Sequence, residues 1–200
     1  MNGDAVPSYP KVEYLYSHEE WKYSMRRTMQ EIVPGLFLGP YSSAMRSKLE
    51  ELKSSGIKGI VCVRHSLEAQ FIRPNFLDHF RYLILDIADS TSENIIQHFV
   101  TVRDFINEIL ESGGKVLVHG NAGISRSAAL VLAYVMEKYG LEFKKAYDLV
   151  QQRRFCINPN VGFMFQLEEY EPIYKARLLQ CSQSPSKIIN KRTCDEIEED

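Results

Sequence analysis

The sequence contains few cysteines. Only Cys62, Cys156, Cys181 and Cys194 occur among its 200 residues. They are too few and too scattered for a disulfide framework, and none forms the Cys-x-x-Cys pair of a zinc site. We therefore expect a reduced, intracellular protein with no disulfide, no metal and no cofactor.

Long apolar stretches are also absent. The longest, Ala128–Met136, has nine residues, whereas a membrane-spanning helix needs about 20. The N-terminus has neither the basic start nor the apolar segment of a signal peptide, and the C-terminal sequence EIEED is no lipidation motif. These features predict a soluble protein without a membrane partner.

An excess of basic residues is missing as well. Lys and Arg number 24 and Asp and Glu 26, for a formal charge of −2, which argues against a nucleic-acid partner. The apolar content of 44% is enough for the core of one domain. We expect an N-terminal arm at 1–27 with Trp21 as an anchor, a folded domain at 28–177, and a disordered acidic tail at 178–200.

Apolar periodicity predicts strands alternating with helices. The expected elements are a hairpin at Glu31–Gly39 around Pro34-Gly35, a helix at Ser42–Ser54, a strand at Ile57–Val63, irregular chain with a short helix at 64–80, a strand at Arg81–Ile87, a helix at Asn94–Glu111, a strand at Lys115–His119, and helices at Arg126–Tyr139, Glu142–Arg154 and Val161–Leu179, the last kinked or shortened by Pro172. The pattern favours an α/β fold with a central, mainly parallel sheet flanked by helices. Ligands of such sheets bind at the carboxyl ends of the strands, which here points to residues 119–126.

The segment HGNAGISRS, residues 119–127, lies between the last expected strand and a buried helix. A tight loop there can turn its backbone N–H groups inward as an anion-binding nest, and the helix N-terminus adds positive potential. Arg126 in the first helical turn can grip two oxygens. The Gly-Lys-Ser/Thr of a nucleotide-binding loop is missing, so the parts suit a phosphate or sulfate dianion.

This segment matches the signature His-Cys-x-x-Gly-x-x-Arg-Ser/Thr at every defined position except that of the cysteine, which is Gly120. The chain thereby resembles the cysteine-dependent protein phosphatases, in particular the small dual-specificity branch, from about Thr28 to Arg177. The fit extends to Arg153-Arg154-Phe155, Asn158-Pro159-Asn160 and Phe163–Leu167. The resemblance implies that fold, together with phosphate contacts from Gly120, Asn121, Ala122, Gly123, Ile124, Ser125 and Arg126, and loop support from His119, Ser127 and Asn160.

Gly120 removes the nucleophile of the family. In the family a loop thiolate attacks phosphorus, and loss of the nucleophile in another enzyme class lowers turnover by about 10⁶. Ser125 and Ser127 have no adjacent base in sequence. Together with residues 32–44 (IVPGLFLGPYSSA), the glycine makes the chain similar to the pseudophosphatases of this family, so we expect no catalytic residue. The backbone N–H at 120 remains to bind an anion.

Asp89 follows the expected strand YLILDI, where the family carries its general-acid aspartate. Asp86 is the rival, but it falls inside the strand pattern, whereas proton transfer needs a loop residue. We interpret Asp89 as a remnant acid; the alternatives are a helix-start residue and an ordinary surface acid.

Other residues have a simpler interpretation. His119 is equally compatible with a structural role, and in the family it mainly orders the loop. For Arg154 and Asn160 a helix cap or a solvated face is favoured over support of the pocket. The aromatic residues Phe163, Phe165, Tyr170 and Tyr174 are interpreted as core or edge packing.

The resemblance implies a monomer, cytoplasmic and nuclear, that binds phosphorylated Ser, Thr or Tyr on signalling proteins. MAP kinases are the first candidate partners, because the family frequently acts on them. Two alternatives stay open: a scaffold that is indifferent to phosphate, and a weak phosphatase that uses water and Asp89.

Overall fold

The computed structural model describes residues 21–183 and has one five-stranded sheet of order β1-β2-β5-β3-β4. The strands are β1 Gln30–Val33, β2 Leu36–Pro40, β3 Ile57–Arg64, β4 Arg81–Asp86 and β5 Lys115–Gly120. Only β1 is antiparallel to its neighbour; β2, β5, β3 and β4 all run parallel. The predicted hairpin, strands and mainly parallel α/β sheet are confirmed.

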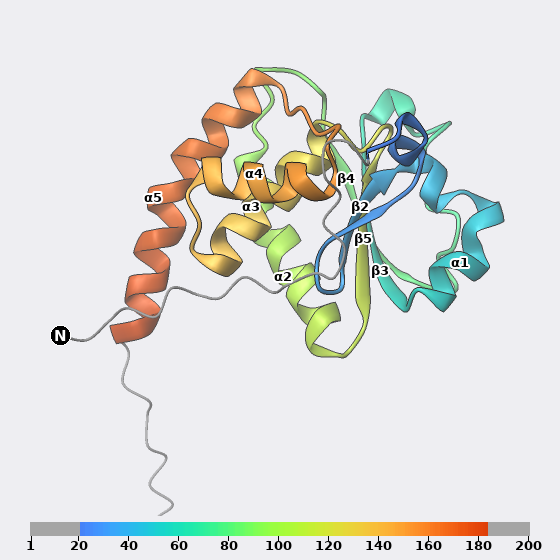
Figure 1. The fold of residues 1–200 in the computed structure, drawn as a ribbon, viewed down its shortest axis with the longest axis horizontal. Coiled ribbons are helices and arrows are strands. Elements are labelled where there is room, and N and C mark those ends of the chain that lie inside the picture. Colours follow the sequence, from blue (N-terminus) through green and yellow to red (C-terminus); the bar gives the residue numbers. More distant parts are fainter. Residues whose placement is uncertain (1–20, 184–200) are drawn as a thin grey trace, which may run out of the picture.

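Both faces of the sheet are covered, which is why residues 59–63 of β3 and 116–118 of β5 are all buried. Alternate residues of β3 point to opposite sides: Ile60 packs in a smaller cluster with Leu52, and Val61 in the main core with Val118. Helix α1, Leu49–Ser54, lies on the side of the smaller cluster. Figure 1 shows the other four helices gathered across the sheet from it.

Those four helices are α2 Phe99–Glu111, α3 Arg126–Tyr139, α4 Phe143–Arg153 and α5 Val161–Gln183. Helix α3 is buried from Arg126 to Glu137, because it lies between the sheet and the outer helices. It ends at Gly140, whose φ of 63° is the left-handed conformation that glycine adopts freely. The apolar α3 predicted from sequence is thus the central helix, and its first turn meets the end of β5.

The single helix predicted at Ser42–Ser54 is wrong in part. The segment forms 3-10 turns at Tyr41–Ala44 and Arg46–Lys48 and becomes α-helical only at Leu49. Met45 between the two turns has an extended backbone (φ −73°, ψ 158°). The Ser42 hydroxyl donates to the carbonyl of Arg27, and such side-chain bonds compete with helix formation.

The predicted C-terminal boundary is also wrong. Helix α5 continues through Pro172 to Gln183, so residues 178–183 are helical and not part of a disordered tail. Packing outweighs the hydrogen bond that proline removes, since Tyr170 and Tyr174 on either side of Pro172 are buried in the main core.

The N-terminal boundary needs a similar correction, because residues 23–27 form a 3-10 turn on the domain. The ring of Trp21 lies 6.4 Å from that of Phe155, as its predicted anchoring role requires. The rest of the predicted arm, 1–20, and of the predicted tail, 184–200, lies outside the described residues.

The aromatic residues of α5 divide into two groups. Phe163, Tyr170 and Tyr174 are buried as predicted, whereas Phe165 is 61% exposed and is not core. Between residues 21 and 183 no helix has the length and apolar character needed to cross a bilayer.

Candidate phosphate-binding site

The loop at residues 121–125 connects the carboxyl end of β5 to the N-terminus of α3. Its turn requires glycine at 123, where φ is 67° and a Cβ atom would lie 2.3 Å from the carbonyl oxygen of Gly39. The backbone of β2 therefore lies directly against the loop, as the parallel pairing of β2 and β5 requires.

Every carbonyl from residue 121 to 125 is turned outward and bound by a neighbouring donor. In order, the donors are the Tyr41 N–H (3.1 Å), Arg154 Nη2 (3.0 Å), Arg154 Nε (2.8 Å), the Asn158 N–H (2.9 Å) and the Ala129 N–H (2.8 Å). Within the described residues, the N–H groups of 121–125 have no acceptor. A loop fixed in this way leaves its donors for an anion.

Arg126 is held in a defined orientation beside this loop. Its Nη1 and Nη2 donate to the two carboxylate oxygens of Glu68, at 2.6 and 3.1 Å, and Nη1 also donates to the Ile87 carbonyl at 3.1 Å. A guanidinium has five N–H donors in a planar fork. The contacts among described residues use neither Nε–H nor the second Nη2 hydrogen. These two point the same way and can bind two phosphate oxygens.

Glu68 is the site residue that sequence analysis missed. It also lies 3.5 Å from Asn121 Nδ2, and the hydrogen bond from Arg126 is the main cause that lowers the pKa of its carboxyl. Glu68 follows β3, and β3 and β5 are parallel neighbours, so residues beyond their carboxyl ends meet at one edge. That rule was the available signal, but the sequence predicts only irregular chain with a short helix at 64–80.

Asp89 lies at the same edge. Its Oδ1 accepts hydrogen bonds from the Ser125 hydroxyl (2.6 Å) and from Asn160 Nδ2 (2.8 Å). Asp86 instead ends β4, with its carboxylate 3.5 Å from Arg64 Nε. The structure therefore brings Asp89, and not its rival, to the loop.

Asn160 has two functions at once. Its backbone N–H donates to the Ser125 hydroxyl at 3.2 Å, while its own Oδ1 accepts from the N–H of Phe163 at 3.0 Å at the start of α5. The favoured interpretation as a helix cap is right, and the contacts to Ser125 and Asp89 add the supporting role implied by the resemblance.

For Arg154 the favoured interpretation was wrong. The side chain is fully buried. Besides the carbonyls of Ala122 and Gly123, it donates to the carbonyls of Arg26 (3.1 Å) and Thr28 (2.9 Å) and to Gln30 Oε1. Arg154 thus ties the loop to the N-terminal segment of the domain.

His119 and Ser127 flank position 120 in the interior. Burial lowers the pKa of His119 to about 4, so the ring is neutral at physiological pH, and it lies 5.8 Å from the ring of Tyr41. Among described residues, neither His119 Nε2 nor Ser127 Oγ has a hydrogen-bond partner. A Cβ atom added at Gly120 would stand 3.2 Å from that Ser127 oxygen.

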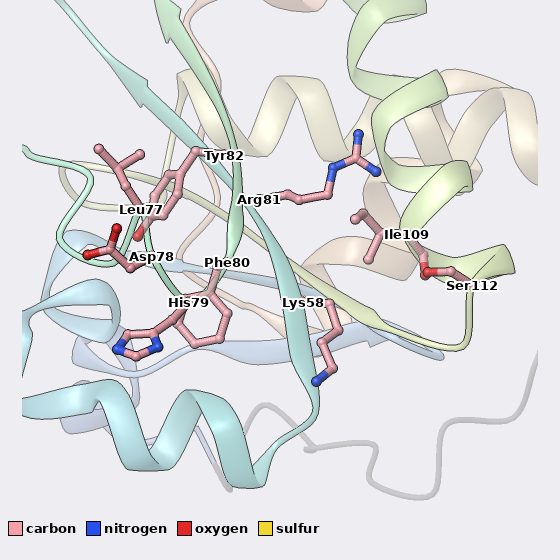
Figure 2. Close-up of a pocket in the computed structure, with 9 residues that line it drawn as sticks. All are labelled: Lys58, Leu77, Asp78, His79, Phe80, Arg81, Tyr82, Ile109 and Ser112. Atoms are coloured by element: carbon pink, nitrogen blue, oxygen red, sulfur yellow. The ribbon is translucent and has the colours of Figure 1, made fainter.

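These residues enclose a cavity of about 170 Å³, lined by Asp89 and residues 120–127. A wider hollow of about 730 Å³ (Figure 2) lies near Lys58 and Arg81, at the amino ends of β3 and β4 and so at the opposite edge of the parallel sheet. Arg81 there is paired with Glu108 at 2.5 and 3.0 Å. The smaller cavity combines the free N–H groups of the loop with the free edge of Arg126, a set of converging donors that suits an anion.

The family described as "Dual specificity phosphatase, catalytic domain" matches residues 36–173. The chain belongs to the dual-specificity phosphatase family. Human serine/threonine/tyrosine-interacting protein is 61% identical over 170 residues, covering 85% of this chain and 76% of the relative. The Xenopus laevis protein of that name, form B, is 57% identical over 193 residues, covering 90% and 86%.

The fold is shared as well. The crystal structure of human tyrosine phosphatase-like serine/threonine/tyrosine-interacting protein matches with a TM-score of 0.74 and 62% identity. The match covers 74% of this chain and 99% of that one. The dual-specificity phosphatase fold is therefore confirmed, and the chain is a phosphatase-like protein similar to the serine/threonine/tyrosine-interacting proteins.

Proposed function

We propose that this chain is a pseudophosphatase: it binds phosphorylated Ser, Thr or Tyr on signalling proteins and shields or anchors them without hydrolysis. The observation that carries the proposal is the loop itself. Its carbonyls from 121 to 125 are all held outward, and its N–H groups are left for an anion beside the free edge of Arg126.

The charges around the loop favour a phosphate group in spite of nearby carboxylates. Glu68 and Asp89 oppose a dianion, whereas Arg126, the loop N–H groups and the N-terminus of α3 attract it. A nucleophilic thiolate would add a third negative charge. Two unit charges 4 Å apart repel by about 4 kcal/mol at an effective dielectric of 20, so glycine at 120 favours retention of the phosphate.

Hydrolysis lacks its attacking group. Gly120 has no side chain, and the Ser125 hydroxyl is engaged between Asp89 and the N–H of Asn160. The Ser127 oxygen is buried beneath position 120. The phosphoryl acceptor of the family mechanism is therefore missing, while the binding groups remain.

The partners and the location of the protein are proposed by analogy with the family. MAP kinases are the first partners to test, and the protein would act as a monomer in the cytoplasm and the nucleus. The charge balance of −2 favours neither nucleic acid nor an anionic surface.

Calorimetry with a phosphopeptide and its unphosphorylated form tests the proposal. We expect binding of the phosphorylated form alone, and at least a tenfold loss in Arg126→Met, since that variant removes both free donors. Arg46→Met, at an exposed position, is the matched control and should bind like wild type. Binding of both peptide forms, or an unaffected Arg126→Met variant, would contradict the proposal.

Pull-down from cell extract, with and without phosphatase treatment, extends the test to whole partners. Capture that survives phosphatase treatment and Arg126→Met would identify a phosphate-independent scaffold. Release of phosphate from the peptide by wild type, lost in Asp89→Ala, would identify the weak phosphatase instead.

A further inference from the structure

The connection after β3 carries two exposed apolar side chains beside the phosphate cavity. We name residues 65–73 the rim loop. Leu67 is 81% and Phe71 74% exposed. Single exposed apolar residues are ordinary on protein surfaces. These two differ because Glu68, in the same turn, reaches Arg126 and Asn121 of the cavity wall.

The rim loop is fixed in place although its apolar side chains are exposed. The N–H groups of Phe71 and Ile72 donate to the Glu68 carbonyl at 2.9 and 2.8 Å. Arg64 Nη1 donates to the Ile72 carbonyl at 2.8 Å, and Ile72 itself is buried. A rigid loop loses little conformational entropy when a ligand binds to it.

The N–H of Phe71 donates to the Glu68 carbonyl at 2.9 Å, which places the two residues at the ends of one tight turn. Leu67 is the residue before Glu68, and consecutive Cα atoms are about 3.8 Å apart. A phosphorylated residue in the cavity is joined to neighbours at that same spacing. The backbone on either side of a phosphorylated residue held beside Arg126 is therefore brought near Glu68 and the rim loop that carries it.

We propose that the rim loop is the second half of the ligand site, and that Leu67 and Phe71 receive a large apolar side chain adjacent to the phosphorylated residue of a partner protein. The inference rests on the proposed function and adds to it a sequence preference. Arg126 and the loop N–H groups bind the phosphate, whereas the rim loop selects what stands beside it.

Short Ser/Gly peptides with one central phosphoresidue, flanked on both sides either by Leu or by Ser, provide the test. One set carries phosphotyrosine and a second phosphoserine, and calorimetry is done on the full chain. One of the two sets should bind. Within that set we expect the Leu-flanked peptide to bind about tenfold tighter than the Ser-flanked peptide, because its apolar surface leaves water.

The double variant Leu67→Ser/Phe71→Ser should reduce this preference to less than about twofold while binding inorganic phosphate as wild type does. Leu77→Ser is the matched control. Leu77 is 64% exposed in the same connection but lines the hollow at the opposite edge of the sheet (Figure 2). This variant should keep the tenfold preference.

Failure of this inference is distinguishable from failure of the proposed function. Two outcomes overturn the role of the rim loop alone. They are phosphate-dependent binding with equal affinity for the Leu-flanked and Ser-flanked peptides, and a preference for the Leu-flanked peptide that survives the double variant. Equal binding of unphosphorylated and phosphorylated peptides, or no binding of any phosphopeptide, overturns the proposed function and this inference with it.

Discussion

At the scale of single residues, position 120 lies among groups that fit a larger side chain. Ser127 Oγ and His119 Nε2 are buried next to it without a partner in the described part of the chain. Buried polar atoms normally find hydrogen-bond partners. A thiolate at 120 would accept a bond from the Ser127 hydroxyl, since a Cβ atom there stands 3.2 Å from its oxygen.

Gly120→Cys should therefore fold and gain hydrolysis of an aryl phosphate. The contact to Ser127 is tight, but a hydroxyl-bearing side chain can shift by a few tenths of an ångström, and no left-handed backbone is required at 120. Release of nitrophenol from its phosphate ester measures the gain. Gly120→Ala, which adds the Cβ without the sulfur, is the control and should stay inactive.

A folded Gly120→Cys variant without activity would mean that other groups are also unsuited to catalysis. The first to examine would be Asp89, whose Oδ1 already accepts bonds from Ser125 and Asn160.

His119 makes stability depend on pH. Its pKa is about 4 in the folded protein against 6.5 as the ordinary value, so between these values the unfolded chain binds a proton that the folded chain does not. Stability must then fall as the pH falls. From pH 7.5 to 5 the loss from this group is about 2 kcal/mol.

Urea unfolding at both pH values gives the change in the free energy of unfolding for wild type and for His119→Asn. The difference between these two changes measures the loss due to His119. His98, whose pKa burial also lowers, is present in both and cancels. If the variant does not fold, the ring signals of His119 in wild-type NMR spectra decide the matter. A His119 titration midpoint near 6.5 would contradict the assignment.

At the scale of secondary-structure elements, the loop at residues 121–125 is held in its conformation by contacts with segments far from it in sequence. Arg154, just after α4, binds the carbonyls of Ala122 and Gly123 and also those of Arg26 and Thr28. One buried guanidinium therefore connects the end of α4, the start of the domain and the loop.

Arg154→Met should lower the free energy of unfolding by about 3 kcal/mol or more, because it leaves several buried carbonyls without donors. It should also weaken phosphate binding at least tenfold, since the loop carbonyls are then free to turn inward. Denaturant unfolding and calorimetry measure the two effects. Arg46→Met, an exposed arginine, should change stability by less than about 0.5 kcal/mol.

The sequence predicted those elements whose formation is decided locally. Runs of β-branched residues marked β3 and β5, and the apolar stretch after Arg126 marked α3. Prediction from the sequence failed where a contact with a distant segment decides the conformation or burial of a residue. Neighbouring residues gave no reason to bury Arg154, because its partner Thr28 lies 126 positions away, and Pro172 was tolerated because of packing against the core.

The site shows the same division. The loop at 119–127 could be identified because its signature is contiguous in the sequence. Glu68 lies 58 positions from Arg126, and only the order of strands in the sheet brings them together. Sequence spacing alone does not encode that order.

At the scale of the whole molecule, the cavity is assembled from elements in distant parts of the described chain. β5 and α3 supply the loop, the rim loop supplies Glu68, and the β4–α2 connection supplies Asp89. These contacts exist together only in the folded state. Phosphate binding must therefore stabilise the fold as a whole, by about 1.4 kcal/mol for each tenfold rise above the dissociation constant.

Thermal unfolding in increasing inorganic phosphate measures this stabilisation. Wild type should gain about 3–5 °C in Tm per tenfold rise once the site begins to saturate. Arg126→Met should show only the general effect of a kosmotropic salt, and that effect is subtracted.

Gly120→Cys should gain less than wild type at pH 7.5, because its thiolate repels the dianion. Gly120→Ala, which has the Cβ but no charge, should resemble wild type. If the cysteine variant gained as much as wild type, loss of the thiolate would not account for phosphate retention. If Arg126→Met did so, the anion would bind elsewhere. The expected order of Tm gains, with wild type and alanine above cysteine, therefore tests whether the glycine that replaces the family's nucleophile also strengthens binding.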